Sequence, residues 1–137
     1  MDKRTADGGL IGRIDRKVDS LGRFRVPAKW FKTAGENKFV YVMPDPEEVC
    51  LRLIPSRTMD ARLAKLRERA QNDPGTNQTL LTIGAVVEQL KADDEGCVEI
   101  SRKLLEFAGI KRRLVMVGGE WYTQLWSPKE LRRRGEK

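Results

Sequence analysis

The most constraining feature of the sequence is a nine-residue motif that occurs twice. The first copy, residues 19–27, reads DSLGRFRVP, and a degraded second copy, residues 93–101, reads DDEGCVEIS 74 residues further along the chain. The same offset relates Ala34-Gly35 to Ala108-Gly109 and the apolar run at 40–43 to that at 114–117. A spacing that extends beyond the motif indicates an internal duplication, and a repeat restricts the architecture more than any single element does.

Local patterns predict the same order of elements in each copy. In the first copy, alternation from Ile11 to Val18 and at Phe24 to Val26 predicts a β-hairpin around the Asp-x-x-Gly turn. Pro27 ends the second strand, and a short helix over residues 28–32 is expected to stop at Ala34-Gly35. Antiparallel strand pairs are expected at 38–43 with 49–54 and, in the second copy, at 114–117 with 121–126.

Two helices are predicted between the copies and one after them. Ser56 can cap a helix whose apolar positions follow three- and four-residue steps up to Ala70. Asn-Asp-Pro-Gly at 72–75 ends it, and an apolar second helix is expected from about 77 to 90. These helices, about 57–90, are predicted to form a hairpin. Ser-Pro-Lys-Glu at 127–130 combines a cap, a first-turn proline and a glutamate, which is typical of a helix start.

Length and hydropathy predict one domain. A chain of 137 residues can bury one compact core, so we expect a single domain over 10–137, with repeats at about 10–55 and 84–128 and a polar lead-in at 1–9. No segment approaches the roughly 18 consecutive apolar residues of a membrane span, and the N-terminus lacks the apolar core of a signal peptide. The expectation is a soluble, cytoplasmic protein without a membrane partner.

The residue types present argue against a metal site and against catalysis. The chain has no histidine, and its two cysteines, Cys50 and Cys97, are expected to be free thiols. The usual zinc ligand sets cannot be assembled, so no metal or cofactor is expected. An enzyme is the least favoured class, because no nucleophile–base pair and no phosphate-binding glycine loop is present, and no small-molecule substrate is expected.

Charge is distributed unevenly along the chain. Residues 1–38 hold ten Lys/Arg against five Asp/Glu, and residues 102–137 hold ten against four. Residues 39–101 between them hold seven against eleven. Two basic flanks around an acidic middle could form one positive surface that attracts polyanions, although solubilising charge alone would give the same totals.

The first turn concentrates the residues that could bind nucleic acid. Arg23 follows a turn that Asp19 and Gly22 are expected to stabilise, so the turn presents its guanidinium. Such a side chain can read guanine, and cations around it can contact phosphates. The same pattern would also suit a structural Asp19–Arg23 pair that locks the turn, and both roles can coexist. The candidate DNA-binding residues are Arg13, Arg16, Lys17, Arg23, Arg25 and Lys29.

The repeated motif resembles that of the MraZ family of bacterial transcriptional regulators, over about residues 10–131. The resemblance rests on Asp-x-x-Gly-Arg-x-x-Val-Pro, its recurrence with a helical hairpin between copies, Gly12 ahead of the motif and Leu125-Trp126 after the second copy. MraZ proteins are similar to AbrB-type factors. The resemblance implies an α+β fold in which two swapped-hairpin β-barrel halves share one chain, with a C-terminal helix.

The resemblance also implies a function. It implies a homo-oligomeric ring that binds repeated promoter elements in double-stranded DNA of the division and cell-wall gene cluster. It further implies that such a protein represses its own operon, associated with the nucleoid. The alternative is an RNA-binding or protein-interaction module with the same fold and no operator specificity.

The second copy departs from the family pattern. Cys97 stands where the pattern has arginine and Ser101 where it has proline, while Asp93 and Gly96 keep the turn-stabilising positions. Either this copy has become structural, or Lys91, Arg102 and Lys103 supply phosphate contacts in its place. The sequence leaves both open.

Overall fold

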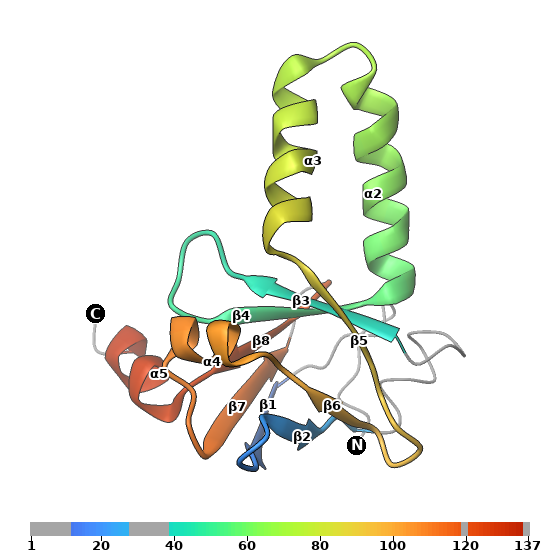
Figure 1. Ribbon diagram of the computed structural model, residues 1–137. Helices are drawn as coiled ribbons and strands as arrows, with labels where there is room; N and C mark the ends of the chain where they lie inside the picture. Colours follow the sequence, from blue (N-terminus) through green and yellow to red (C-terminus); the bar gives the residue numbers. More distant parts are fainter. Residues whose placement is uncertain (1–11, 28–38, 119–120, 136–137) are drawn as a thin grey trace.

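The computed structural model describes residues 12–27, 39–118 and 121–135 (Figure 1). Lys29, the helix expected at 28–32 and the lead-in at 1–9 lie outside these ranges. The elements are β1 (Gly12–Lys17), β2 (Arg23–Arg25), β3 (Phe39–Pro44), β4 (Leu51–Pro55), α2 (Ser56–Ala70), α3 (Pro74–Val86), β5 (Glu88–Lys91), β6 (Cys97–Glu99), α4 (Arg102–Ala108), β7 (Arg113–Gly118), β8 (Thr123–Trp126) and α5 (Pro128–Gly135).

The strands form two antiparallel sheets, which confirms the α+β class. Six strands pair in the order β1-β7-β8-β4-β3-β5, and β2 pairs with β6 in a separate two-stranded sheet. The predicted pairs β3–β4 and β7–β8 are both present. In Figure 1 the helical hairpin α2–α3 stands away from the sheets, and α4 and α5 lie at their side. No described helix has the length and apolar character needed to cross a membrane.

The predicted hairpin between β1 and β2 is wrong, because each strand pairs with the other half of the chain. β1 runs antiparallel to β7, with Lys17 opposite Arg113, and β2 runs antiparallel to β6, with Phe24 opposite Val98. The turn between β1 and β2 does form, and it is closed by a bond from the Asp19 N–H to the Arg23 carbonyl of 3.0 Å. Alternation predicts a strand and its buried face, but it does not select the partner strand.

The two halves make equivalent contacts at the 74-residue offset. The Ile100 N–H donates to the Gly22 carbonyl at 2.9 Å, and the Val26 N–H donates to the Gly96 carbonyl at the same distance. β5 pairs with β3 as β1 pairs with β7. The main core lies between the sheets, where the largest fully buried side chains include Val26, Val98 and Ile100 of this crossing.

Two expectations about the helical hairpin need correction. Ser56 is not a cap, because it is a buried residue of the first turn, preceded by Pro55 at the N-cap. The second helix spans 74–86 rather than about 77–90, because Asp73 caps its start and residues 88–91 form β5 and pair with β3. Glu88 to Lys91 alternates between half-buried and exposed positions, so pairing with a sheet edge overrides helix propensity there.

Side chains cap the starts of the other helices. Asp73 caps α3 by accepting the Gly75 N–H at 3.0 Å and the Thr76 hydroxyl at 2.7 Å. Ser127 accepts the Glu130 N–H at 3.0 Å and so caps α5, as predicted. Ser101, which replaces the proline of the motif, accepts the Leu104 N–H and caps α4.

The first turn fits tightly against the second half of the chain at Gly22. Its φ is +83°, and an added Cβ would lie 2.6 Å from the Ile100 carbonyl oxygen and 3.0 Å from Leu105 Cδ1. Gly22→Ala should therefore lower the free energy of unfolding by on the order of 2–4 kcal/mol, from backbone strain and overpacking together. Urea denaturation measures this, with Gly84→Ala as control, because a Cβ there meets nothing within 4 Å. Equal stability of Gly22→Ala and wild type would contradict the tight fit.

Candidate nucleic-acid interface

The first turn holds Arg23 through both its backbone and its side chain. Asp19 Oδ1 accepts the N–H groups of Leu21 and Arg23, each at 2.9 Å, and Asp19 Oδ2 accepts Arg23 Nε at 2.8 Å. The Arg23 side chain remains 51% exposed. Its Nη atoms make no hydrogen bond to any described residue. The geometry therefore combines the structural pair with a free guanidinium edge, the two roles that the sequence had left open.

The second turn repeats the backbone geometry without the cation. Asp93 Oδ1 accepts the N–H groups of Glu95 and Cys97, each at 2.9 Å, and the Gly96 N–H donates to the Asp93 carbonyl. Cys97 offers a half-buried thiol where Arg23 offers a guanidinium. The carboxylate residues Asp94, Glu95 and Glu99 are exposed around it. The two turns are alike in backbone and opposite in charge.

The other predicted cations differ in what they contact. Arg16 Nε donates to the Arg25 carbonyl at 2.8 Å, so this half-buried side chain braces β2. Arg25 forms an exposed ion pair with Glu95 at 3.3 Å, a kind of pair that contributes little to stability. Lys17 is exposed at the end of β1 that enters the turn. Arg13 is exposed too, but four residues back along β1, about 13 Å from Lys17.

Hydrogen bonding keeps the turn groups charged. The pKa of Asp19 is lowered, chiefly by the backbone N–H of Arg23 and also by its guanidinium. The pKa of Arg23 is raised by its bond to Asp19. The pKa of Asp93 is lowered as well, chiefly by the backbone N–H of Cys97 and then by that of Glu95. Each carboxylate is therefore ionised at neutral pH, and Arg23 keeps its positive charge.

Sequence reasoning missed a run of cations beside the first turn. Lys111, Arg112 and Arg113 are all exposed, and the Arg112 carbonyl accepts the Val18 N–H at 2.8 Å. The three residues were counted in the charge of residues 102–137 but were not singled out. Three adjacent cations in the sequence could have identified them as a candidate phosphate-binding segment. Its position next to Asp19 follows from the pairing of β1 with β7, which the alternation pattern did not reveal.

The two cysteines do not form a disulfide. Both are free thiols, as predicted. Cys50 is fully buried, and burial raises its pKa to about 12, so it stays protonated and unreactive. Among the described residues, no three His, Cys, Asp or Glu side chains gather in a way that could hold a metal ion.

Comparison with known proteins links the chain to a group of regulators. It is 36% identical over 137 residues to the transcriptional regulator MraZ of Rhodospirillum rubrum, covering 93% of this chain and 86% of that protein. The proteins of the same name from Chlorobaculum parvum and Thermomicrobium roseum are 26% and 25% identical, over 90% and 93% of this chain and 82% and 87% of their own length. No protein-family model matches the chain.

The lowered pKa of Asp93 predicts a loss of stability in acid. The unfolded chain binds a proton near the ordinary pKa of 3.8, and the folded protein binds it only at lower pH. The stabilisation is therefore fully present above 3.8 and is lost as the pH falls through the folded value. Asp93→Asn keeps an acceptor oxygen but cannot ionise, so its unfolding midpoint in urea should fall less between pH 6 and pH 2.5. Asp15→Asn, outside both turns, controls for net charge, and parallel curves for wild type and Asp93→Asn would contradict the assignment.

Proposed function

The chain belongs to the MraZ family of transcriptional regulators, and on that premise we propose that it reads double-stranded DNA through its first turn. The observation that carries this proposal is Arg23, which Asp19 holds through Nε while the Nη atoms make no hydrogen bond to any residue that the structure describes. The chain is thus proposed to be a sequence-specific DNA-binding regulator rather than an enzyme. Its proposed place of action is the nucleoid.

The geometry of β2 suits recognition of the base edges in a groove of DNA. Phe24 is buried between Arg23 and Arg25, which are both exposed, so strand alternation puts the two arginines on one face. A planar guanidinium can contact the O6 and N7 atoms of guanine together, and its fixed orientation reduces the entropy lost on binding. Lys17 and Arg25 flank Arg23 and are proposed to contact phosphates, as is Arg13 further along β1.

The second turn is proposed to play a structural part. Its backbone matches the first, but it has no guanidinium, and the exposed carboxylates of Asp94 and Glu95 precede Cys97 and would repel phosphates. One chain therefore offers one reading turn. The matching contacts of the two halves support the interpretation that the chain is a duplicated swapped-hairpin unit, with both halves in one polypeptide.

One reading turn cannot supply much affinity by itself. A good bidentate pair discriminates by about 1–3 kcal/mol, so several turns acting together are needed for a specific regulator. Copies joined in a homo-oligomeric ring would raise the effective concentration of each turn on repeated promoter elements. By resemblance to the family, the proposed targets are the promoter repeats of the division and cell-wall gene cluster, where the protein represses its own operon.

The first prediction of this proposal concerns Arg23. Arg23→Ala should weaken binding to the promoter upstream of the gene by about 1–3 kcal/mol per site, because alanine cannot hydrogen-bond the base. Fluorescence anisotropy on promoter and scrambled duplexes measures it, with Arg69→Ala in the last turn of α2 as an equal change of charge. Unchanged discrimination between the two duplexes in Arg23→Ala would remove Arg23 from the reading surface.

The affinity for the promoter duplex should depend strongly on salt concentration. Each phosphate contact releases counterions, so the logarithm of the binding constant should fall linearly with the logarithm of salt concentration, at about −0.9 per phosphate neutralised. Titrations between low and moderate salt on the promoter duplex give this slope. A flat response would favour a protein partner, and an equal response on single-stranded RNA would favour the RNA-binding alternative.

A further inference from the structure

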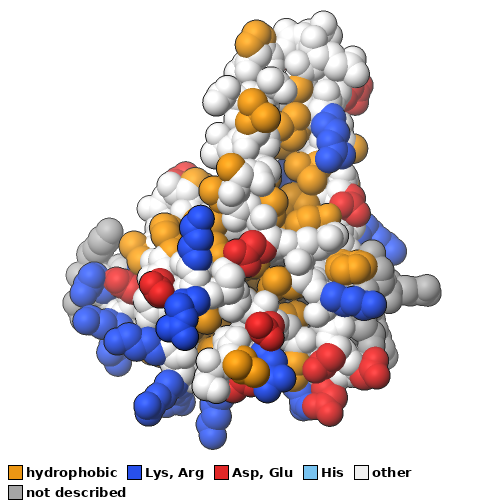
Figure 2. Space-filling model, viewed as in Figure 1, with side chains coloured by type: hydrophobic (Ala, Val, Ile, Leu, Met, Phe, Trp, Pro, Cys, Tyr) orange, Lys and Arg blue, Asp and Glu red, His pale blue; other side chains and the backbone are white. Residues whose placement is uncertain are grey.

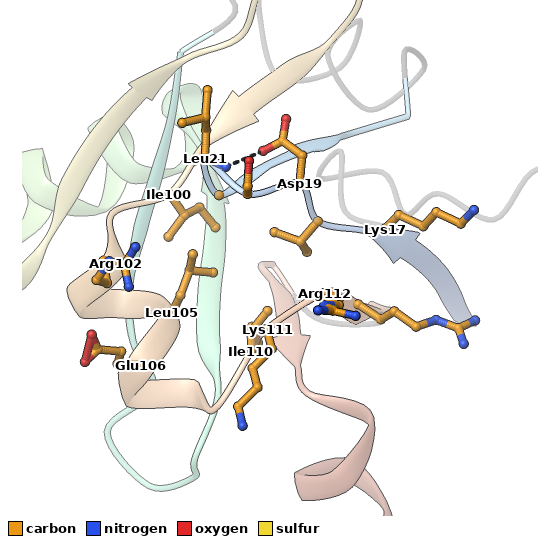
Figure 3. Close-up of a pocket in the computed structure, with 14 residues that line it drawn as sticks. Lys17, Asp19, Leu21, Ile100, Arg102, Leu105, Glu106, Ile110, Lys111 and Arg112 are labelled. Carbon is orange, nitrogen blue, oxygen red and sulfur yellow. Dashed lines mark hydrogen bonds between the residues drawn. The ribbon is translucent and has the colours of Figure 1, made fainter.

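A groove lies beside the first turn, and its rim is strongly cationic. It encloses about 1030 Å³ between β1, the turn, α4 and the connection from α4 to β7. Figure 3 shows Ile100 and Leu105 on its apolar floor, with Arg102 on one side and Lys17 on the other. The cations of the rim are Lys17, Arg102, Lys111, Arg112 and Arg113.

The rim cations have no neutralising partner within residues 12–27, 39–118 and 121–135. No hydrogen bond or ion pair joins any of the five side chains to another described residue. The groove also has two carboxylates, Asp19 and Glu106, and Asp19 already pairs with Arg23. Of the predicted site residues, by contrast, Arg23 and Arg25 are both in ion pairs. Among the described residues near the turn, the positive charge without an ion-pair partner is thus concentrated at this groove. Figure 2 shows Lys and Arg side chains gathered along the lower left edge of the molecule.

Backbone hydrogen bonds fix the groove relative to the reading turn. One wall is tied to the end of β1 by the bond from the Val18 N–H to the Arg112 carbonyl. The floor is tied to the turn by the bond from the Ile100 N–H to the Gly22 carbonyl, each bond being 2.9 Å or shorter. A duplex held at Arg23 would therefore meet the rim cations at a constant offset.

We propose that this groove binds the phosphate backbone of the duplex that Arg23 reads, an inference that rests on the proposed function. The rim cations come from β1, α4, the connection from α4 to β7, and β7 itself. In Figure 3 the side chains of Lys17 and Lys111 point in different directions. A compact anion needs donors that converge, whereas DNA presents charges spaced along a strand. The apolar floor supports the methylene stems of long cations, whose charged ends stay in water.

The expected contribution is affinity without sequence information. Phosphate contacts position a protein on the duplex but do not distinguish bases. The groove and Arg23 thus have separable roles. Removing the groove cations should weaken every duplex alike, whereas removing Arg23 should weaken the promoter duplex selectively.

The test compares two triple variants with the same change of charge. Lys111→Gln, Arg112→Gln and Arg113→Gln are combined in one protein, and Lys65→Gln, Arg67→Gln and Arg69→Gln on α2 are combined in the control. Each is titrated with promoter and scrambled duplexes across a range of salt. The groove variant should weaken both duplexes by the same factor and make the salt slope shallower by about one for each phosphate that is no longer neutralised. The control should keep the wild-type slope.

The possible results separate the two proposals. Wild-type protein that binds promoter and scrambled duplexes equally would overturn the proposed function, and the groove assignment with it. A groove variant with the wild-type slope, while Arg23→Ala loses discrimination, would overturn the groove alone. Equal effects of the two triple variants would show that only the net charge of the protein matters, and this result would also overturn the groove assignment.

A footprint on the unaltered protein covers the case in which the groove variant fails to fold. Lysine acetylation is measured by mass spectrometry with and without promoter duplex. Lys17 and Lys111 should be protected by the duplex, and Lys65 on α2 should not be. Protection of Lys17 without protection of Lys111 would place the duplex on the turn but outside the groove, against the proposal.

Discussion

The short ladder between β2 and β6 is the contact on which the rest of the molecule depends. Each strand is only three residues long, yet the carbonyls of Gly22 and Gly96 each accept a bond from the residue that follows the opposite strand. Phe24 and Val98 are buried at its centre. In the six-stranded sheet, β1 pairs with β7 and β5 pairs with β3. The β2–β6 ladder is separate from that sheet and joins the two turns directly. The position of Arg23 and the floor of the cationic groove both follow from it.

The two turns show how one backbone geometry can carry opposite charges. Cys97 lies directly opposite Arg25 in the ladder, so an arginine at position 97 would face another arginine. Like charges in opposed positions destabilise a sheet, and a thiol avoids that cost. Glu95 instead pairs with Arg25 and brings negative charge to the second turn. The absence of a second guanidinium is therefore compatible with the charge on the first strand.

Local chemistry was readable from the sequence, whereas long-range pairing was not. The turn at Asp19, the cap at Ser127 and the paired strands β3–β4 depend on neighbouring residues, and the sequence predicts them. The helix expected to reach Leu90 fails because β3 provides a sheet edge for residues 88–91. The cation run at 111–113 lies about 90 residues from Asp19 in the chain, and only the β1–β7 pairing brings them together. Hydrophobic periodicity identifies helices and strands, but it does not predict which distant strands pair with one another.

The exchange of strands between halves also has a consequence for synthesis on the ribosome. Gly12 pairs with Gly118 and Lys17 with Arg113, so β1 has no partner until roughly 100 further residues have been added. At about 5–20 residues per second, the strand waits on the order of 5–20 s with its ladder edge open. The N-terminal half cannot complete its sheets ahead of the C-terminal half, so the edge of β1 stays open to pairing with neighbouring copies until translation is almost finished.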